Sequence, residues 1–212
     1  REYDEFNRLT VLSDIYGIKT YYSYTPEGMI SRIERKDGDN LLTSIAITYN
    51  DNGMPVSYID QAGRKKSFER DAFGRIVREL FPDDTAIEYT YNLTGQLTAV
   101  VDQNKNKICF DWGKFGLESR TTPAGQLTDY VYDKFGVLAK IDSSKDGQSD
   151  RTISYEYDKF DRPVKITYGD NEVVTYSYDS WGKVISASRG SKKATYTYDY
   201  FGRMIEKKDG AV

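Results

Sequence analysis

Aromatic and small polar residues alternate in short stretches along the whole chain, which predicts β-strands. In the stretch ATYTYD at 194–199, Tyr196 and Tyr198 fall on one face of an extended backbone and the intervening threonines on the other. Thr and Tyr both favour strands. A second alternating stretch follows each first one after a few residues, as in RIVREL at 75–80. The chain is therefore predicted to be all-β.

The two stretches belong to a repeat of about 21 residues that fills residues 1–212. The last residue of the first stretch, here called the anchor, is aromatic in every copy except the one at Arg70. The ten anchors are Tyr3, Tyr24, Tyr49, Arg70, Tyr91, Trp112, Tyr132, Tyr157, Tyr178 and Tyr198. Successive anchors lie 20 or 21 residues apart, except for two steps of 25 residues. Regular recurrence of this kind indicates a repeat architecture.

Two positions after each anchor have the chemistry of a tight turn. The first position is Asp or Asn in eight copies, among them Asp133, Asp158, Asp179 and Asp199. Its side chain can accept hydrogen bonds from backbone N–H groups just ahead. The fourth position, here called the glycine position, is Gly in eight copies, including Gly136, Gly182 and Gly202, and is Asn7 or Asp161 in the other two. These residue types tolerate positive φ, so each copy is predicted to be a β-hairpin.

A single hairpin cannot bury its own face, so neighbouring copies must pair. We expect about ten antiparallel hairpins in one domain, residues 1–212, forming a continuous curved or spiralling sheet with ladders of stacked Tyr across the strands. Such a sheet has two unpaired edge strands, which predicts self-association through its edges.

The composition of the chain argues against several classes of function. The net charge of −3 and the pI of about 5.2 disfavour nucleic-acid binding. Nineteen Tyr combined with a mean hydropathy of −0.68 suit a thin sheet that is wet on both faces. The absence of His excludes Ser-His-Asp and Cys-His catalysis and His-based metal sites, and the single Cys109 excludes an intrachain disulfide. No run is apolar enough to insert into a membrane, and a start without Met predicts a piece of a longer protein.

The stretches YTYDYFGRM, YVYDKFGVL and YEYDKFDRP resemble the YD repeat of the Rhs family, whose signature is Tyr-Asp-x-x-Gly-Arg. Tyr198, Asp199, Gly202 and Arg203 match that signature in full. In the family, the repeats form a spiral sheet that closes into a hollow shell. The shell encloses a C-terminal toxin domain in bacterial polymorphic toxins, and animal teneurins use a related shell in adhesion.

The resemblance implies a non-enzymatic segment of shell wall in a large bacterial protein that is secreted or attached to the cell surface. The implied partner is the remainder of the same polypeptide, including a C-terminal domain. Two features depart from the family. The chain has no Asp-Pro dipeptide, which belongs to the segment that closes many Rhs cores, and it contains no toxin-like domain.

Other interpretations stay open at this stage. A surface-binding module would recognise glycans or a partner cell through exposed Tyr and Trp side chains such as Trp181. Choline- or glucan-binding repeats have a similar length but lack the turn signature. A propeller blade would take two repeats, about 42 residues, but odd and even copies do not alternate in sequence. An enzyme is disfavoured, because the turn aspartates recur by translation whereas an active site needs convergent groups.

One enlarged turn, DSSKDGQSD at 142–150, raises the possibility of a calcium loop. Its oxygen-bearing side chains are spaced like positions 1, 3, 5, 7 and 9 of such a loop: Asp142, Ser144, Asp146, Gln148 and Asp150. Gly147 falls at position 6, but Ile153 replaces the Glu of position 12. The alternative is a polar hairpin tip. No other cofactor is expected.

Overall fold

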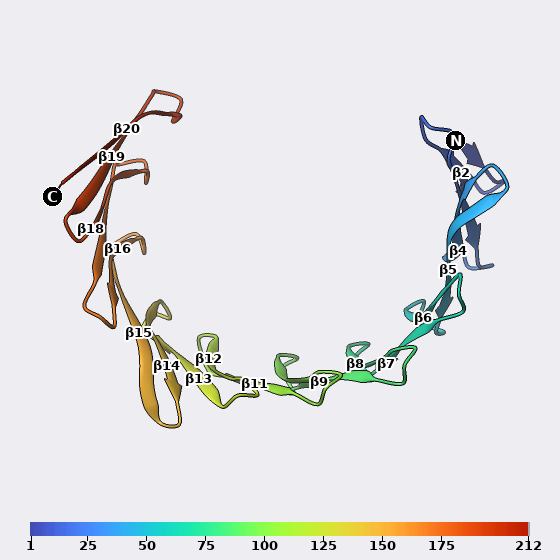
Figure 1. Cartoon of the computed structure of the whole chain (residues 1–212), viewed down its shortest axis with the longest axis horizontal. Coiled ribbons are helices and arrows are strands. Elements are labelled where there is room, and N and C mark those ends of the chain that lie inside the picture. Colours follow the sequence, from blue (N-terminus) through green and yellow to red (C-terminus); the bar gives the residue numbers. More distant parts are fainter. Residues whose placement is uncertain (212) are drawn as a thin grey trace. The chain divides into compact units, whose positions relative to one another are not determined.

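The computed structural model describes residues 1–211, whose regular elements are 20 β-strands (Figure 1). They divide between two units, Arg1–Asn106 and the chain from Lys107 onward. The first unit contains β1 (Glu2–Tyr3), β2 (Leu9–Ser13), β3 (Lys19–Tyr24), β4 (Ile30–Asp37), β5 (Asn40–Tyr49), β6 (Pro55–Asp60), β7 (Lys65–Arg70), β8 (Ile76–Leu80), β9 (Ala86–Tyr91) and β10 (Leu97–Val101). The second contains β11 (Lys107–Trp112), β12 (Leu117–Thr121), β13 (Gln126–Tyr132), β14 (Leu138–Lys145), β15 (Gln148–Tyr157), β16 (Pro163–Tyr168), β17 (Val173–Tyr178), β18 (Val184–Arg189), β19 (Lys192–Tyr198) and β20 (Met204–Ala211).

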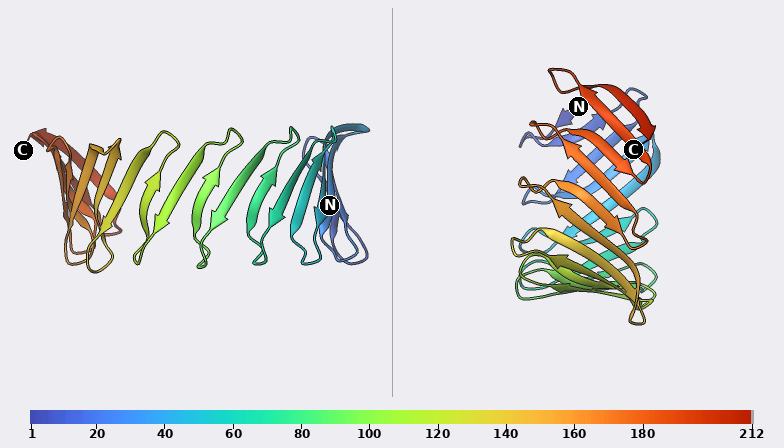
Figure 2. Two further views of the ribbon diagram at one scale, coloured as in Figure 1. Left: turned by 90° about the horizontal axis from the view of Figure 1, so that it is seen from below. Right: turned by 90° about the vertical axis from the view of Figure 1, so that its left-hand side faces the viewer.

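Within each unit, every strand pairs antiparallel with the next strand in sequence. The ladder of the first unit runs from β1 to β10, and that of the second unit from β11 to β20. In both units the turns therefore line up along two opposite edges of the sheet (Figure 2). The predicted all-β array of antiparallel hairpins is confirmed. No helix long and apolar enough to cross a membrane occurs between residues 1 and 211.

The turns have the backbone conformation that their sequence predicts. Gly136, Gly182 and Gly202 have φ values of 90°, 86° and 83°. Asn7 and Asp161, which stand where the other copies have Gly, have φ values of 61° and 58°. This confirms that residues with positive φ fill the glycine position.

A β-bulge at the anchor was not predicted. In the hairpin of β13 and β14, Val131 faces Lys140 but the next residue, Tyr132, faces Leu138, so that Ala139 is an extra residue on β14. The same shift occurs at Tyr157, Tyr178 and Tyr198. A bulge bends the strand and redirects the side chain beside it. It therefore sets the direction of each anchor ring.

The sheet has almost no deep interior. The buried residues among 1–211 are all small, namely Val11, Ala86, Ala99, Ser44 and Ser57, and no large side chain is fully buried. Larger side chains are half-buried against their cross-strand neighbours, as in the row of Tyr130, Ile141 and Ile153. Stability must therefore come from contacts between adjacent hairpins.

Candidate functional site

The repeated turn is the feature that the sequence singles out, and it is built around the aspartate. In the copy at 132–137, the backbone N–H groups of Phe135 and Val137 donate to Oδ1 of Asp133 at 2.8 and 2.9 Å. The N–H of Gly136 donates to the Asp133 carbonyl at 3.1 Å. The N–H of Val137 is the leading cause of a lowered pKa at Asp133, because it stabilises the ionised carboxylate.

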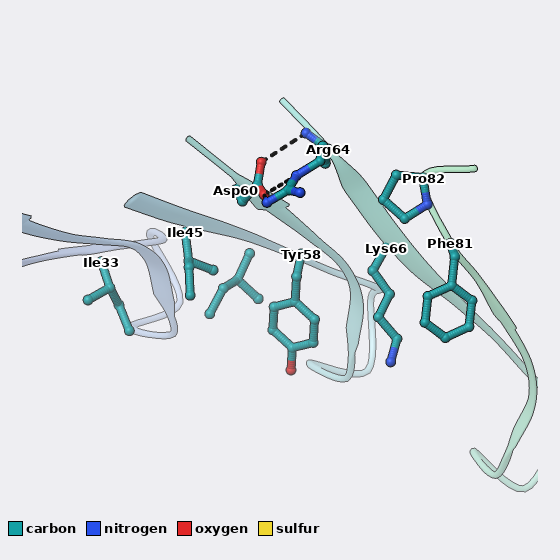
Figure 3. A pocket seen from close by; sticks show the side chains of 9 residues that line it. Ile33, Ile45, Tyr58, Asp60, Arg64, Lys66, Phe81 and Pro82 are labelled. Carbon is teal, nitrogen blue, oxygen red and sulfur yellow. Dashed lines mark hydrogen bonds and ion pairs between the residues drawn. The ribbon is translucent and has the colours of Figure 1, made fainter. Parts of the chain in front are cut away.

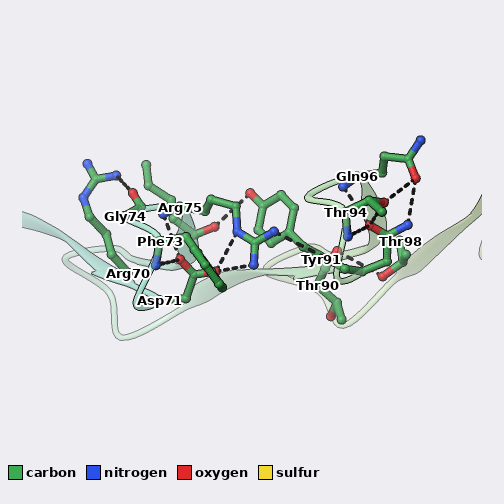
Figure 4. Close-up of polar contacts among 12 residues, drawn as sticks. Arg70, Asp71, Phe73, Gly74, Arg75, Thr90, Tyr91, Thr94, Gln96 and Thr98 are labelled. Atoms are coloured by element: carbon green, nitrogen blue, oxygen red, sulfur yellow. Dashed lines mark hydrogen bonds and ion pairs between the residues drawn. The ribbon is translucent and has the colours of Figure 1, made fainter.

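An arginine completes the turn in the four copies where it directly follows the glycine position. The Nε atoms of Arg162 and Arg203 donate to Oδ2 of Asp158 and Asp199, each at 2.7 Å. The same pairing joins Arg75 to Asp71 (Figure 4) and Arg8 to Asp4. The hydrogen bond from Arg162 holds the pKa of Asp158 below its ordinary value. These carboxylates are fixed inside their own turns, so none is free to act on a substrate.

The anchor hydroxyls join each hairpin to the one before it. The hydroxyl of Tyr178 donates to the backbone carbonyl of Pro163 at 2.7 Å, and that of Tyr198 to the carbonyl of Val184 at 2.8 Å. Five more anchors make the same bond to the first residues of the preceding hairpin's second strand: Tyr24, Tyr49, Tyr91, Tyr132 and Tyr157. Because each bond spans 14 to 19 residues, the anchor links consecutive repeats.

The expected ladder of Tyr rings needs correction. A complete strand separates successive anchors, so the ring of Tyr178 meets the Arg162 guanidinium of the previous turn, with Cζ 4.6 Å from the ring centroid. Arg8 lies over Tyr24 and Arg75 over Tyr91 at 4.6 and 4.7 Å. The arginine of the signature therefore serves two repeats: it pairs with its own Asp and covers the next anchor ring.

In some copies the glycine position also lies close to a side chain of the preceding turn. A Cβ at Gly136 would lie 2.7 Å from Cδ1 of Phe115, in the preceding turn, and one at Gly74 would lie 3.0 Å from the sulfur of Met54. Positive φ and this contact both favour Gly there.

Arg70 replaces the anchor tyrosine and takes over part of its role. Its Nη1 donates to the Gly74 carbonyl at 2.9 Å and its Nη2 to the Pro55 carbonyl at 3.2 Å, the place that an anchor hydroxyl would reach. Figure 4 shows the guanidinium directed at Gly74. The Nε of Arg70 is buried and has no hydrogen-bond partner. Arg70, in place of the tyrosine of the other copies, thus keeps the link between hairpins but leaves its Nε donor without a partner.

The predicted calcium loop folds as a hairpin tip. Strands β14 and β15 run through it and turn at Asp146 and Gly147, which have φ values of 51° and 76°. The Asp142 carboxylate accepts bonds from Thr152 at 2.6 Å, and from Lys140 and Ser149 at 3.1 Å each.

Ser144, Gln148 and Asp150 lie on the two strands of that hairpin. Across residues 1–211, no group of three or more His, Cys, Asp or Glu side chains is placed to hold a metal ion. Calcium binding at this hairpin stays a prediction.

The first unit has an open apolar hollow of about 520 Å³ on one face of β4 to β8. Ile33, Ile45, Tyr58, Lys66 and Phe81 point into it from the same side of the sheet (Figure 3). The Lys66 ammonium lies 4.8 Å from the Phe81 ring centroid and pairs with Glu79 at 2.7 Å. The hollow has the chemistry to accept an apolar side chain, and the charged groups in its lining are paired, Asp60 with Arg64 and Lys66 with Glu79.

Comparison with known proteins agrees with this geometry. The sequence model of the Teneurin YD-shell family matches residues 141–211. The Double-stranded DNA deaminase toxin A of Burkholderia cenocepacia (strain H111) is 26% identical over 195 residues, which cover 88% of this chain and 13% of that protein. The resemblance to YD repeats that the motifs predict is confirmed.

Solved structures show the same fold. TcdB2-TccC3 without its hypervariable C-terminal region aligns with a TM-score of 0.67 at 13% identity, covering 98% of this chain and 15% of that one. The Tc holotoxin pore of Photorhabdus luminescens aligns with a TM-score of 0.60 at 14% identity, covering 98% and 14%. The chain thus spans about one seventh of the length of these proteins.

Proposed function

We propose that this YD-repeat chain is a wall segment of a shell in a large exported bacterial protein, and that the shell encloses or presents a C-terminal toxin domain. The wall is non-enzymatic. Its partners are the other parts of the same polypeptide, and its place is outside the cell or on its surface.

The link between each anchor hydroxyl and the preceding hairpin supports this proposal most directly. It recurs by translation along both units, at seven anchors within residues 1–211, and none of these seven copies differs from the others as a catalytic centre would. Polar groups such as Asp158 and Arg162 form hydrogen bonds with each other and thereby stabilise their own turns. Both the links between hairpins and the stabilised turns are features that a shell wall requires.

The relatives support the toxin part of the proposal. One is named a toxin, and this chain matches only 13% of its length, which leaves ample room for a separate active domain in a protein of that kind. The Tc holotoxin and TcdB2-TccC3 share the fold over nearly the whole of this chain.

The first experiment is to read the encoding gene beyond Val212 to its stop codon. We expect further repeats followed by an unrelated terminal domain, and expression of that domain alone should poison bacteria. A reading frame that ends in repeats or in a wall anchor would contradict the container. The chain itself should convert no cytosine to uracil in double-stranded DNA, and measurable turnover would overturn the non-enzymatic assignment.

A surface-binding module is the second candidate, because several aromatic side chains at the turns are exposed, including Trp181 at 87%. It requires the isolated chain to bind glycans or bacterial cells, which a glycan array measures directly. A shell wall requires no such binding.

A further inference from the structure

Along one of the two edges that hairpin turns form, the second unit carries an unbroken row of exposed aromatic side chains. The residue before the glycine position is aromatic in all five turns of this unit, with exposed fractions of 41%, 76%, 64%, 87% and 80%. We call these residues the aromatic row: Phe115, Phe135, Phe160, Trp181 and Phe201. Tyr200, beside the last of them, is 97% exposed.

The row is confined to one edge. The same position in the first unit holds Phe6 and Phe73 but also Glu27, Asn52 and Thr94, so the row is interrupted there. On the opposite edge of the second unit, no turn within the described residues exposes a large hydrophobic side chain. The two edges of this unit therefore differ in chemistry, although both consist of hairpin turns (Figure 2).

The geometry of the row restricts what can cover it. Turns on one edge recur every second strand, so the rings stand about 10 Å apart, twice the spacing of paired strands. A covering surface must present gaps or rings with the same period. The same edge of another YD-repeat array has that period by construction.

The charges of this edge are mixed rather than of one sign. The Nζ atoms of Lys114, Lys134 and Lys159 lie 4.8 to 4.9 Å from the centroids of the neighbouring Phe rings. Asp161 and the turn aspartates place carboxylates along the same edge. An edge with both signs interspersed does not repel a reversed copy of itself as an edge of one sign would, and it is poorly suited to a strongly anionic surface.

The exposed area is that of a stable interface. An aromatic side chain buries about 150–250 Å², so at the observed exposures the row and Tyr200 offer roughly 900 Å². A standard interface buries about 800 Å² per partner. We propose that the aromatic row pairs with the same row of a second YD-repeat array, in the simplest case a second copy of this chain, about a two-fold axis. This pairing goes beyond the shell-wall assignment and does not depend on it.

Sedimentation equilibrium of the whole chain over a wide concentration range tests the pairing. We expect a monomer–dimer equilibrium that weakens roughly tenfold or more for each ring removed in Phe135→Ser, Phe160→Ser and Trp181→Ser. The matched control is Phe6→Ser with Phe73→Ser, which removes exposed rings from the same turn position in the first unit and should leave dimerisation unchanged. Trp181 fluorescence should shift to shorter wavelength as the dimer forms.

Three results would overturn the pairing. The first is a monomer at all concentrations. The second is association that survives all three ring substitutions but is lost in Ile205→Lys, which places a charge on the open edge strand β20. The third is association that survives the substitutions while they abolish binding to an oligosaccharide, which would assign the row to glycans. Circular dichroism of each variant shows that the fold is retained.

Discussion

The hydroxyl of Tyr157 donates a 2.7 Å hydrogen bond to the carbonyl of Leu138, 19 residues earlier in the chain. The same bond recurs at seven anchors within residues 1–211. Burial raises the pKa of Tyr157, so the hydroxyl remains a donor at neutral pH. A thin sheet without a deep core thus gains one specific hydrogen bond wherever a hairpin with a tyrosine anchor follows another hairpin.

Tyr157→Phe should lower the free energy of unfolding by about 0.5–1.5 kcal/mol, because it removes one hydrogen bond and leaves the ring in place. Tyr155→Phe is the matched control: it lies on the same strand and face, and its hydroxyl has no hydrogen bond in the part of the chain that is described. Urea denaturation of both variants measures the difference. Equal losses would show that the link contributes nothing specific.

Arg70→Tyr should stabilise the chain by about 1 kcal/mol. A phenol at this anchor can reach the Pro55 carbonyl as the other anchors reach theirs, and the substitution removes the buried Nε that lacks a partner. Arg70→Lys is the control, since it loses the second donor without restoring the ring, and it should be destabilising. A lower melting temperature for Arg70→Tyr would show that the arginine has its own role.

The hairpins and their turns could be predicted from the sequence, because turn chemistry is local. Positive φ at Asn7 and Asp161 follows from residue type alone. The antiparallel array follows from alternation and from the short repeat. These features need no knowledge of which hairpin lies beside which.

The links between hairpins could not be predicted in the same way. The acceptor for Tyr157 is a backbone carbonyl, which has no side-chain identity to read. The bulge that aims the ring depends on pairing register. The one available signal was the spacing itself. The arginine that follows the glycine position stands 16 residues before the next anchor, as Arg162 does before Tyr178, and this makes their contact geometrically possible.

Gly136→Val should destabilise the chain far more than Lys140→Ala. Gly136 has a φ of 90°, and an added Cβ would meet Phe115 at 2.7 Å, so a cost of about 1–3 kcal/mol or more is expected. Lys140 is 40% exposed and pairs with Asp142, and its loss should cost about 0.5 kcal/mol or less. Thermal denaturation of the two variants compares these costs. Similar losses would undo the assignment of the turn.

If the hairpin at 142–150 is a polar tip, the alternative to a calcium loop, millimolar calcium should leave the melting temperature unchanged. The Asp142 carboxylate is already occupied by Thr152, Lys140 and Ser149. A calcium-dependent rise that disappears in Asp146→Asn would instead establish the loop as a calcium site, and magnesium serves as the control ion.

Acid should destabilise the turns in a defined pH window. Hydrogen bonds from Arg75 and Arg162 hold the pKa values of Asp71 and Asp158 below their ordinary value, while a backbone N–H and the Arg203 side chain lower that of Asp199. A carboxyl with a lower pKa in the folded state stabilises the fold above its unfolded pKa, about 3.9, and loses that contribution as the pH falls through the folded value. The urea midpoint should therefore be flat from pH 7 to about 5 and decline below about 4. Asp158→Asn keeps the turn acceptor but removes the titrating group, so its decline should be shallower. An equally steep decline in that variant would place the acid sensitivity in other groups.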